Sequence, residues 1–356
     1  MTVLWINLAI VFLFSLFSRY FSNTLVLNGS LVSIKPNKLL AFGTILSFIL
    51  VSGLRNNIGD TPFYMHTYNI NNFTWELIQS QDDIGFGVLQ MILQRYSEDP
   101  QILIFTTAVI TNVLIIIGLY KYSRLFELSI YVYITGGLFL VTMNGIKQCL
   151  ATAIIFTATK YLIEGNWFRY ILVVIFASLF HQSALILIPI YFLVRYRAWS
   201  KATVILLFFS ILIVLGFNQF SKVLFTAIED SQYGVYGGFN EGGANILRVI
   251  VFAVPLVIAF FGREKLRKIY PESDFIVNMA LIGLSFMIIS TGNWIFARFN
   301  IYFELYQIIL ISWIIKVFRE KDQKLVYYAI VVCYFAYYYY ETVINLNIKY
   351  TSNYLG

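Results

Sequence analysis

Charged residues are scarce in this chain. Asp, Glu, Lys and Arg make up 12% of the 356 residues, while 59% are hydrophobic. Soluble domains carry about twice that share of charge, and no water-soluble fold hides so much apolar surface. The composition therefore excludes a soluble protein and indicates a membrane protein that crosses the bilayer many times.

Cysteine and histidine are also nearly absent. The two cysteines, Cys149 and Cys333, lie inside apolar runs, as packing residues do, and say nothing about a redox compartment. With only His66 and His181 the chain excludes a histidine-rich metal cluster, and no Walker loop, nucleophile elbow or zinc spacing occurs. We therefore expect no metal and no other cofactor. The net charge of +7 belongs to loops between apolar runs, so we expect no nucleic-acid partner.

What the chain has in abundance is apolar runs close to the length of about 20 residues that a spanning helix needs. The predicted fold class is all-α, a polytopic helical bundle. Spans are predicted near residues 2–18, 39–54, 101–120, 126–142, 146–163, 201–217, 245–262, 275–292, 299–317 and 324–340.

The segment 168–194 is long for one span and short for two. If it is a hairpin of two short helices that enters and leaves on one side, most of the 25 basic residues fall on the inner side of the membrane. A single span would split the later basic loops from the earlier ones. The positive-inside rule therefore favours the hairpin, 11–12 crossings, and both termini outside. Short hairpin arms imply a cavity that opens outward, with His181 and Gln182 at the turn.

We expect residues 1–356 to form a single membrane domain with two large outer loops, 55–100 and 218–244. The first follows a predicted span and begins with the polar stretch 54–68, LRNNIGDTPFYMHTY. From the residues alone this stretch is either a connecting loop, since it contains three turn residues, or part of a site. His66 is interpreted as a loop residue.

Ionisable groups at membrane depth are costly, and they are functional candidates for that reason. In the predicted topology Arg55, Asp60, Lys147, His181 and Arg298 gather near the outer leaflet. Each cation alone is better explained by snorkelling to headgroups. Together, three cations beside an outward cavity suit a diphosphate, because arginine offers a planar fork and lysine a compact charge.

Three stretches resemble the EpsG family of Wzy-type exopolysaccharide polymerases. The first contains Arg55, Gly59, Asp60 and Tyr64, spaced as R-x-x-x-G-D-x-x-x-Y. The second runs from Asn144 to Pro189, with NGIKQCLA and FHQSALILIP, and the third is ARFNIYF, which contains Arg298 and Tyr302. The resemblance covers most of the chain. The family usually has arginine before the glutamine of the second stretch, where this chain has Lys147 before Gln148, so the charge is kept and the bidentate fork is lost.

The resemblance implies a polymerase in the bacterial cytoplasmic membrane with its active face outward. It would join undecaprenyl-diphosphate-linked oligosaccharides, with a flippase and a chain-length regulator as further partners. Such a transfer needs no metal, since cationic side chains can stabilise the departing diphosphate. The implied diphosphate ligands are Arg55 and Arg298, assisted by Lys147. Tyr64, Gln148 and Tyr302 would bind substrate, and either Asp60 or His181 would be the base for the acceptor hydroxyl.

Three other functions stay open at this point. A ligase would move a finished glycan to another acceptor by nearly the same chemistry. A polysaccharide O-acyltransferase is kept open by His181 alone. A non-enzymatic flippase or exporter would show internal repeats and polar groups near the midplane, and the sequence shows no repeat.

Overall fold

The structure is a computed structural model that describes residues 1–25, 33–227 and 242–355. Residues 228–241 of the predicted loop 218–244 therefore lie outside the described residues. Apart from a two-stranded antiparallel ribbon, the regular elements in these ranges are helices. The predicted fold class is confirmed: the chain is a polytopic helical membrane protein. Its contacts divide it into two compact units, Met1–Ile186 with Ile311–Gly356, and Leu187–Leu310.

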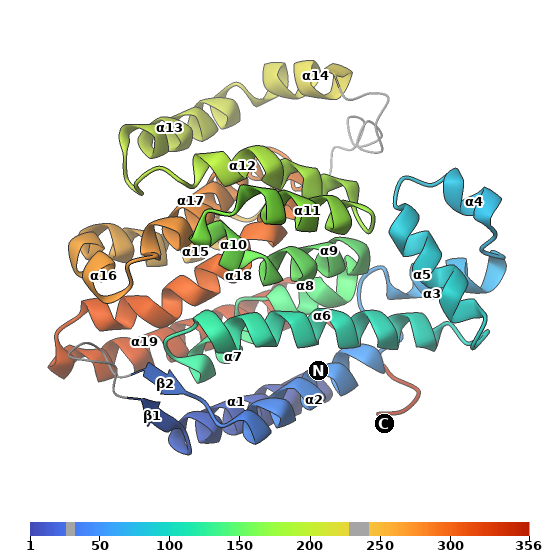
Figure 1. The fold of residues 1–356 in the computed structure, drawn as a ribbon, viewed down its shortest axis with the longest axis horizontal. Coiled ribbons are helices and arrows are strands. Elements are labelled where there is room, and N and C mark those ends of the chain that lie inside the picture. The colour runs from blue at the N-terminus through green and yellow to red at the C-terminus, as the bar shows by residue number, and fades with distance from the viewer. Residues whose placement is uncertain (26–32, 228–241, 356) are drawn as a thin grey trace. The chain divides into compact units, whose positions relative to one another are not determined.

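The first unit begins with two helices that pack against each other, with the two strands of the ribbon between them in the chain (Figure 1). Its elements are α1 (Thr2–Tyr20), β1 (Asn23–Leu25), β2 (Ser33–Lys35), α2 (Lys38–Gly53), α3 (Thr61–Ile70), α4 (Trp75–Gln79), α5 (Ile84–Gln94), α6 (Gln101–Tyr122), α7 (Phe126–Thr135), α8 (Leu138–Asn144), α9 (Ile146–Thr157), α10 (Thr159–Glu164), α11 (Trp167–Ser178) and η1 (Gln182–Ile186). The C-terminal part adds η3 (Ile315–Val317), α19 (Glu320–Tyr339) and η4 (Tyr340–Asn345).

Local sequence explains where several of these helices begin and bend. The side chain of Asn37 caps α2 by accepting the N–H groups of Leu39 and Leu40 at 3.0 and 3.2 Å. Helices α7 and α8 meet at a bend of 56°. Gly137 lies at this bend with φ 98°, a left-handed conformation that glycine adopts without steric cost. The predicted span 126–142 is therefore a broken pair of helices.

Three helical stretches in the described ranges are long and apolar enough to cross a membrane: Thr2–Tyr20, Gln101–Tyr122 and Ile295–Val317. The number rises to five if each of two bent pairs is counted as one span, and further apolar helices are 10–17 residues long. Nearly every predicted span coincides with one helix or with two consecutive helices. The number of crossings stays a prediction, because many of these helices are shorter than a bilayer core requires.

The predicted hairpin segment turns at the expected place. Helix α11 ends at Ser178, the N–H groups of Phe180 and His181 bond to the carbonyl of Ala177, and η1 begins at Gln182. The short helix η1 packs against both α11 and α9 within the first unit. This turn brings His181 to the end of α11 that lies beside the first turn of α9.

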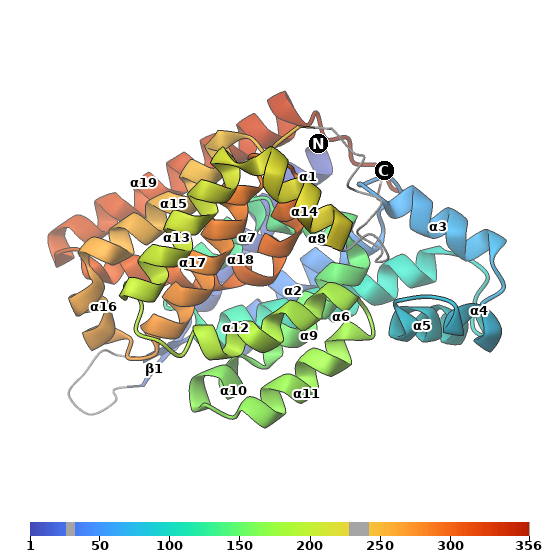
Figure 2. The ribbon, with the colours of Figure 1, turned by 90° about the horizontal axis from the view of Figure 1, so that it is seen from above.

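Residues 61–94, inside the predicted outer loop 55–100, form a small helical group of α3, α4 and α5 (Figure 2). An apolar cluster that includes Tyr68, Phe73 and Phe86 holds the group together and joins it to Ile146, the first residue of α9. The side-chain amide of Gln94 adds a tie by donating to the carbonyl of Tyr68 at 2.9 Å. The group is thus a packed part of the unit, and it fixes the start of α5 relative to α9.

The second unit consists of seven helices in chain order within the described residues. They are α12 (Leu187–Leu193), α13 (Lys201–Leu215), α14 (Phe217–Ala227), α15 (Ile246–Phe261), α16 (Arg263–Ile269), α17 (Ser273–Ile289) and α18 (Ile295–Ile314), whose last residues belong to the first unit. Helix α17 packs against both α13 and α15. The expectation of a single domain over 1–356 stays a prediction.

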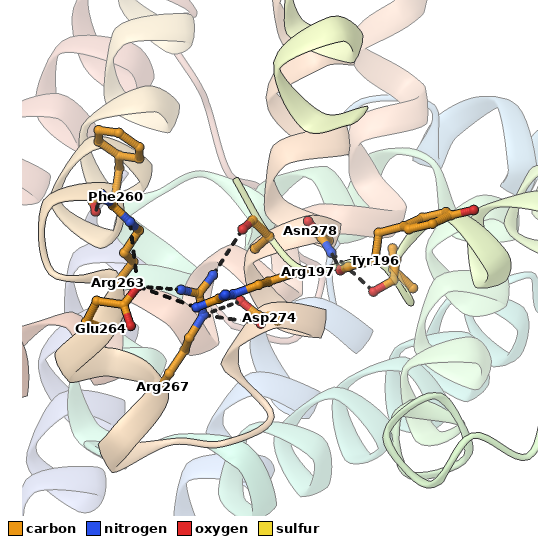
Figure 3. A network of polar contacts seen from close by, with 10 residues as sticks. Tyr196, Arg197, Phe260, Arg263, Glu264, Arg267, Asp274 and Asn278 are labelled. Carbon is orange, nitrogen blue, oxygen red and sulfur yellow. Dashed lines mark hydrogen bonds and ion pairs between the residues drawn. The ribbon is translucent and has the colours of Figure 1, made fainter. Parts of the chain in front are cut away.

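Arg267 joins the two basic loops of the second unit (Figure 3). Its guanidinium donates to Asp274 Oδ1 at 3.0 Å, to Glu264 Oε1 at 2.9 Å and to the backbone oxygen of Ala198 at 3.0 Å. The loop before α13 and the helix α16 therefore lie at the same end of this unit, as the charge pattern predicts.

Candidate active site

The polar stretch after α2 is anchored by a tight turn. Gly59 has φ 53°, and a Cβ built on it would lie 2.1 Å from Asn144 Oδ1. The same Asn144 oxygen accepts the backbone N–H of Asp60 at 2.9 Å. Only glycine permits this close approach between the turn and the end of α8. Asp60 then begins α3 as its N-cap residue, with its side chain partly exposed.

Arg55 is buried in this turn, and its guanidinium binds protein oxygens. The side chain donates from Nε to Thr61 Oγ1 at 2.9 Å, from Nη2 to the carbonyl of Met143 at 2.6 Å, and from Nη1 to the carbonyl of Ser52. The residue is 1% exposed. Burial lowers its pKa to about 9, which leaves the group cationic at neutral pH. These contacts indicate that Arg55 ties α2, α3 and α8 together, and its predicted contact with a diphosphate stays a prediction.

Residues 349–353 are tied to the same turn. Asn57 donates from Nδ2 to the carbonyl of Lys349 and accepts the N–H of Thr351, each at 2.7 Å. Tyr350 donates from its hydroxyl to the carbonyl of Val51 at 2.9 Å. The C-terminal residues thus restrain the turn from the side of α2.

Asp83 is the point at which three segments of the first unit meet. Its Oδ2 lies 3.2 Å from Lys147 Nζ and 3.6 Å from His181 Nδ1. Its Oδ1 accepts the backbone N–H of Gln182 at 3.3 Å. The Asp83 side chain is 5% exposed, against 14% for His181 and 31% for Lys147. The structure therefore brings together Lys147 and His181, two residues that sequence analysis selects 34 positions apart.

Backbone packing sets this geometry. The N–H of Gly85 donates to the carbonyl of Leu179 at 2.7 Å, which fastens the start of α5 to the turn that carries His181. A Cβ on Gly85 would lie 2.8 Å from Leu179 Cβ and 2.9 Å from its carbonyl oxygen. Glycine at this position is what lets Asp83 reach the histidine.

The neighbours of Asp83 stabilise its charged form. Burial alone raises the pKa of this carboxyl group, but the neighbouring His181 and the ammonium of Lys147 outweigh burial and hold the pKa below its ordinary value. The site at neutral pH is therefore a buried carboxylate that faces one lysine ammonium and one imidazole.

Two aromatic rings lie near the Asp83 cluster. The ammonium lies 5.2 Å from the ring centroid of Phe86, and the ring of Tyr64 lies 6.0 Å from that of Phe86. Tyr64 therefore shares a ring neighbour with Lys147. Gln148 follows Lys147 on α9 and is buried. Among the described residues no group of three His, Cys, Asp or Glu side chains is gathered closely enough to hold a metal ion.

Arg298 and Tyr302 belong to the second unit. They lie four residues apart on α18, with the Arg298 guanidinium 5.2 Å from the ring centroid of Trp294 and Tyr302 2% exposed. Their shared substrate role with Lys147 stays a prediction.

Asp83 is a residue of the cluster that was not predicted from the sequence. It lies in an acidic pair with Asp82, inside a segment with several other acids, and nothing in the sequence separates the two. One feature of the sequence could have indicated Asp83. It lies immediately before the first residue of α5, and a carboxylate at a helix start can contact a neighbouring segment. Which neighbour it meets depends on packing between α5, α9 and the turn after α11.

Two features define the class of this protein. Apolar helices make up a membrane bundle, and the first unit holds a buried cluster of a carboxylate, an ammonium and an imidazole, groups that mark functional sites in membrane proteins. The model of the EpsG family matches residues 38–354, and the chain belongs to this family, an exopolysaccharide polymerase-like group of membrane proteins. Comparison with curated proteins and with solved structures found no match.

Proposed function

We propose that the protein polymerises oligosaccharide repeat units that are linked to undecaprenyl diphosphate, at the outer face of the bacterial cytoplasmic membrane. Family membership supports the class of reaction. The single observation that carries the assignment of residues is the meeting of Lys147 and His181 on the carboxylate of Asp83. One cation for a leaving diphosphate and one base for an attacking hydroxyl are the two groups that a metal-independent glycosyl transfer needs.

In the proposed reaction an acceptor sugar hydroxyl attacks the anomeric carbon of the donor sugar. The new glycosidic C–O bond forms while the bond between that carbon and the diphosphate oxygen breaks. The lipid diphosphate leaves with the electron pair, and Lys147 stabilises the charge that develops on it. The hydroxyl proton goes to His181. The lipid-linked acceptor then carries the longer glycan.

The other predicted site residues keep roles within this proposal. Asp60, partly exposed at the start of α3, is the second candidate for the base. Tyr64 and Gln148 contact the sugar or the phosphates near Lys147. Arg298 and Tyr302 on α18 keep the substrate role that the sequence predicts for them. Arg55 holds the turn in place through its three bonds to protein oxygens.

Purified protein in liposomes tests the function directly. With a lipid-diphosphate oligosaccharide as both donor and acceptor, we expect longer lipid-linked chains. No elongation of a competent substrate would refute the polymerase, and transfer to an acceptor without a lipid diphosphate would identify a ligase instead.

Two variants test the residues. Lys147→Gln is expected to lower the elongation rate about 100-fold or more, as loss of a donor to a developing oxyanion does. His181→Gln is expected to lower it by about 10²–10⁴, the usual contribution of general acid–base catalysis. His66→Gln is the matched control, because His66 is exposed on α3. A His181→Gln protein as active as the control would remove His181 from the reaction.

A further inference from the structure

One oxygen of Asp83 serves two positively charged or chargeable partners. Lys147 Nζ and His181 Nδ1 both approach Oδ2, at 3.2 and 3.6 Å. The other oxygen, Oδ1, is engaged by the backbone N–H of Gln182 at 3.3 Å. The backbone amide of Gln182 holds the carboxylate from one side, so that Lys147 and His181 both interact with the other oxygen, Oδ2.

The two partners differ in their freedom to leave. His181 lies in the turn between α11 and η1, which the hydrogen bond between Gly85 and Leu179 fastens to the start of α5. Its side chain is 14% exposed. Lys147 extends on a flexible four-carbon stem, is 31% exposed, and can rotate its ammonium toward an anion outside the cluster. A diphosphate that arrives at the site therefore takes Lys147 from Asp83 and leaves His181 in place.

A buried carboxylate without a cation is costly, because burial disfavours the charged form. When Lys147 turns to a diphosphate, the imidazole becomes the remaining partner that can compensate Asp83. The attraction between the ring and Asp83 Oδ2, which lies 3.6 Å from Nδ1, then favours the protonated form of the ring. Because Nδ1 faces Asp83, Nε2 is the nitrogen that receives the acceptor proton.

We propose that Asp83 is a positioning residue through which binding of the donor diphosphate at Lys147 raises the proton affinity of His181. The inference rests on the proposed function and adds an order of events to the reaction. His181 becomes a stronger base only after a donor has bound. An acceptor hydroxyl is then deprotonated only when a donor sugar is there to be attacked, and water has less opportunity to cleave the donor.

The charged groups around His181 decide which control fits the experiment. Among the described residues, the charged side chains on the segments around it are Asp82 and Asp83 before α5, Lys147 on α9, and Arg169 near the opposite end of α11. Asp82 is exposed and accepts the side-chain amide of Gln182 at 3.4 Å. Asp82 therefore provides a matched control, since it has the same charge and lies one position away without contact to the lysine.

The experiment is a titration of His181 by NMR in the full chain with labelled histidine, held in lipid nanodiscs. The chain has only two histidines, and His66→Gln identifies the second signal. The probe is farnesyl diphosphate, with farnesol as the uncharged reference. We expect the diphosphate to move the His181 titration midpoint upward by about one pH unit, the size of shift that a nearby opposite charge produces.

Variants separate this relay from a direct effect of the anion on the imidazole. Asp83→Asn is expected to abolish most of the shift, while Asp82→Asn keeps it. In Lys147→Gln the His181 titration midpoint is expected to be raised already without the diphosphate, and to change little when the diphosphate is added. A full shift in Asp83→Asn, or none in the wild type once binding of the probe has been measured, would overturn the inference.

Two further measurements keep the outcome decisive. Thermal unfolding of Asp83→Asn shows whether the variant is folded, and Lys147→Gln tests the same relay from the other side if it is not. Elongation assays are independent of the titration. Elongation without a shift overturns the relay alone, whereas a shift without elongation of a competent substrate overturns the polymerase.

Discussion

Replacement of Arg55 separates two roles that the sequence leaves open. In Arg55→Met the carbonyl groups of Met143 and Ser52 and the hydroxyl of Thr61 lose a charged donor in a buried site. Hydrogen bonds to charged groups contribute about 1.5–3 kcal/mol each. Because the hydrophobic side chain recovers some packing, we expect a net loss of about 3–5 kcal/mol in the free energy of unfolding, the range for breaking a buried charged contact.

The measurement is the apparent melting temperature in detergent micelles. We expect Arg55→Met to melt at least about 5 °C below the wild type and Arg55→Lys to lie between them, since a lysine ammonium cannot span three acceptors as a fork. Arg95→Met is the matched control, because Arg95 is exposed at the end of α5. If Arg55→Met kept the wild-type melting temperature but lost elongation, the positioning role would be refuted and direct contact with the diphosphate favoured.

Three further predictions concern the turn and the Asp83 cluster. Gly59 has φ 53°, and a Cβ at this position would lie 2.1 Å from Asn144 Oδ1, so Gly59→Ala should lower the free energy of unfolding by about 1–3 kcal/mol. A second change, Asn144→Ala, should restore part of this loss, and an unchanged melting temperature of Gly59→Ala would contradict the prediction. The pKa of Asp83 lies below its ordinary value of 3.8, so the carboxylate stabilises the folded protein fully above that pH and ceases to do so as the pH falls through the lower folded value. The melting temperatures of wild type and Asp83→Asn should therefore stay apart at neutral pH and converge only below about pH 3.8; a gap that stays constant in acid would argue against it. Asn57→Ala removes two hydrogen bonds to residues 349–353 and should speed the amide hydrogen exchange of Thr351 about tenfold or more. The control is Asn69→Ala at an exposed position, and an equal exchange rate of Thr351 in both variants would show that these hydrogen bonds contribute little.

The long apolar helices were predictable because hydrophobic length is a local property, whereas α3, α4 and α5 lie in the segment 55–100 that was predicted to be an outer loop. Nearly every predicted span coincides with one helix or with two consecutive helices, and the turn at His181 lies inside the segment 168–194, where the charge balance predicts that the chain reverses. The bend at Gly137 was not predicted within the run 126–142. An apolar run shows no change of composition at such a bend, and the conformation of one glycine decides it.

The candidate residues were predictable by type but not by partner. Lys147 and His181 could be selected because charged residues are scarce in this chain. An ionisable group at membrane depth has a high desolvation cost and is therefore a functional candidate. Asp83 was hidden among the acids of the segment 55–100, where charge is unremarkable.

Sequence by itself determined the membrane character, the approximate position of the long apolar helices and the choice of Arg55, Lys147 and His181, because hydropathy and rarity of charge are read along the chain. Only the tertiary structure decided what these side chains do for one another. It buried Arg55 among backbone carbonyls, and it placed Lys147 and His181 on one oxygen of Asp83. Partnerships of this kind depend on the packing of α5 against α9 and the turn after α11, and packing between distant segments leaves no local pattern.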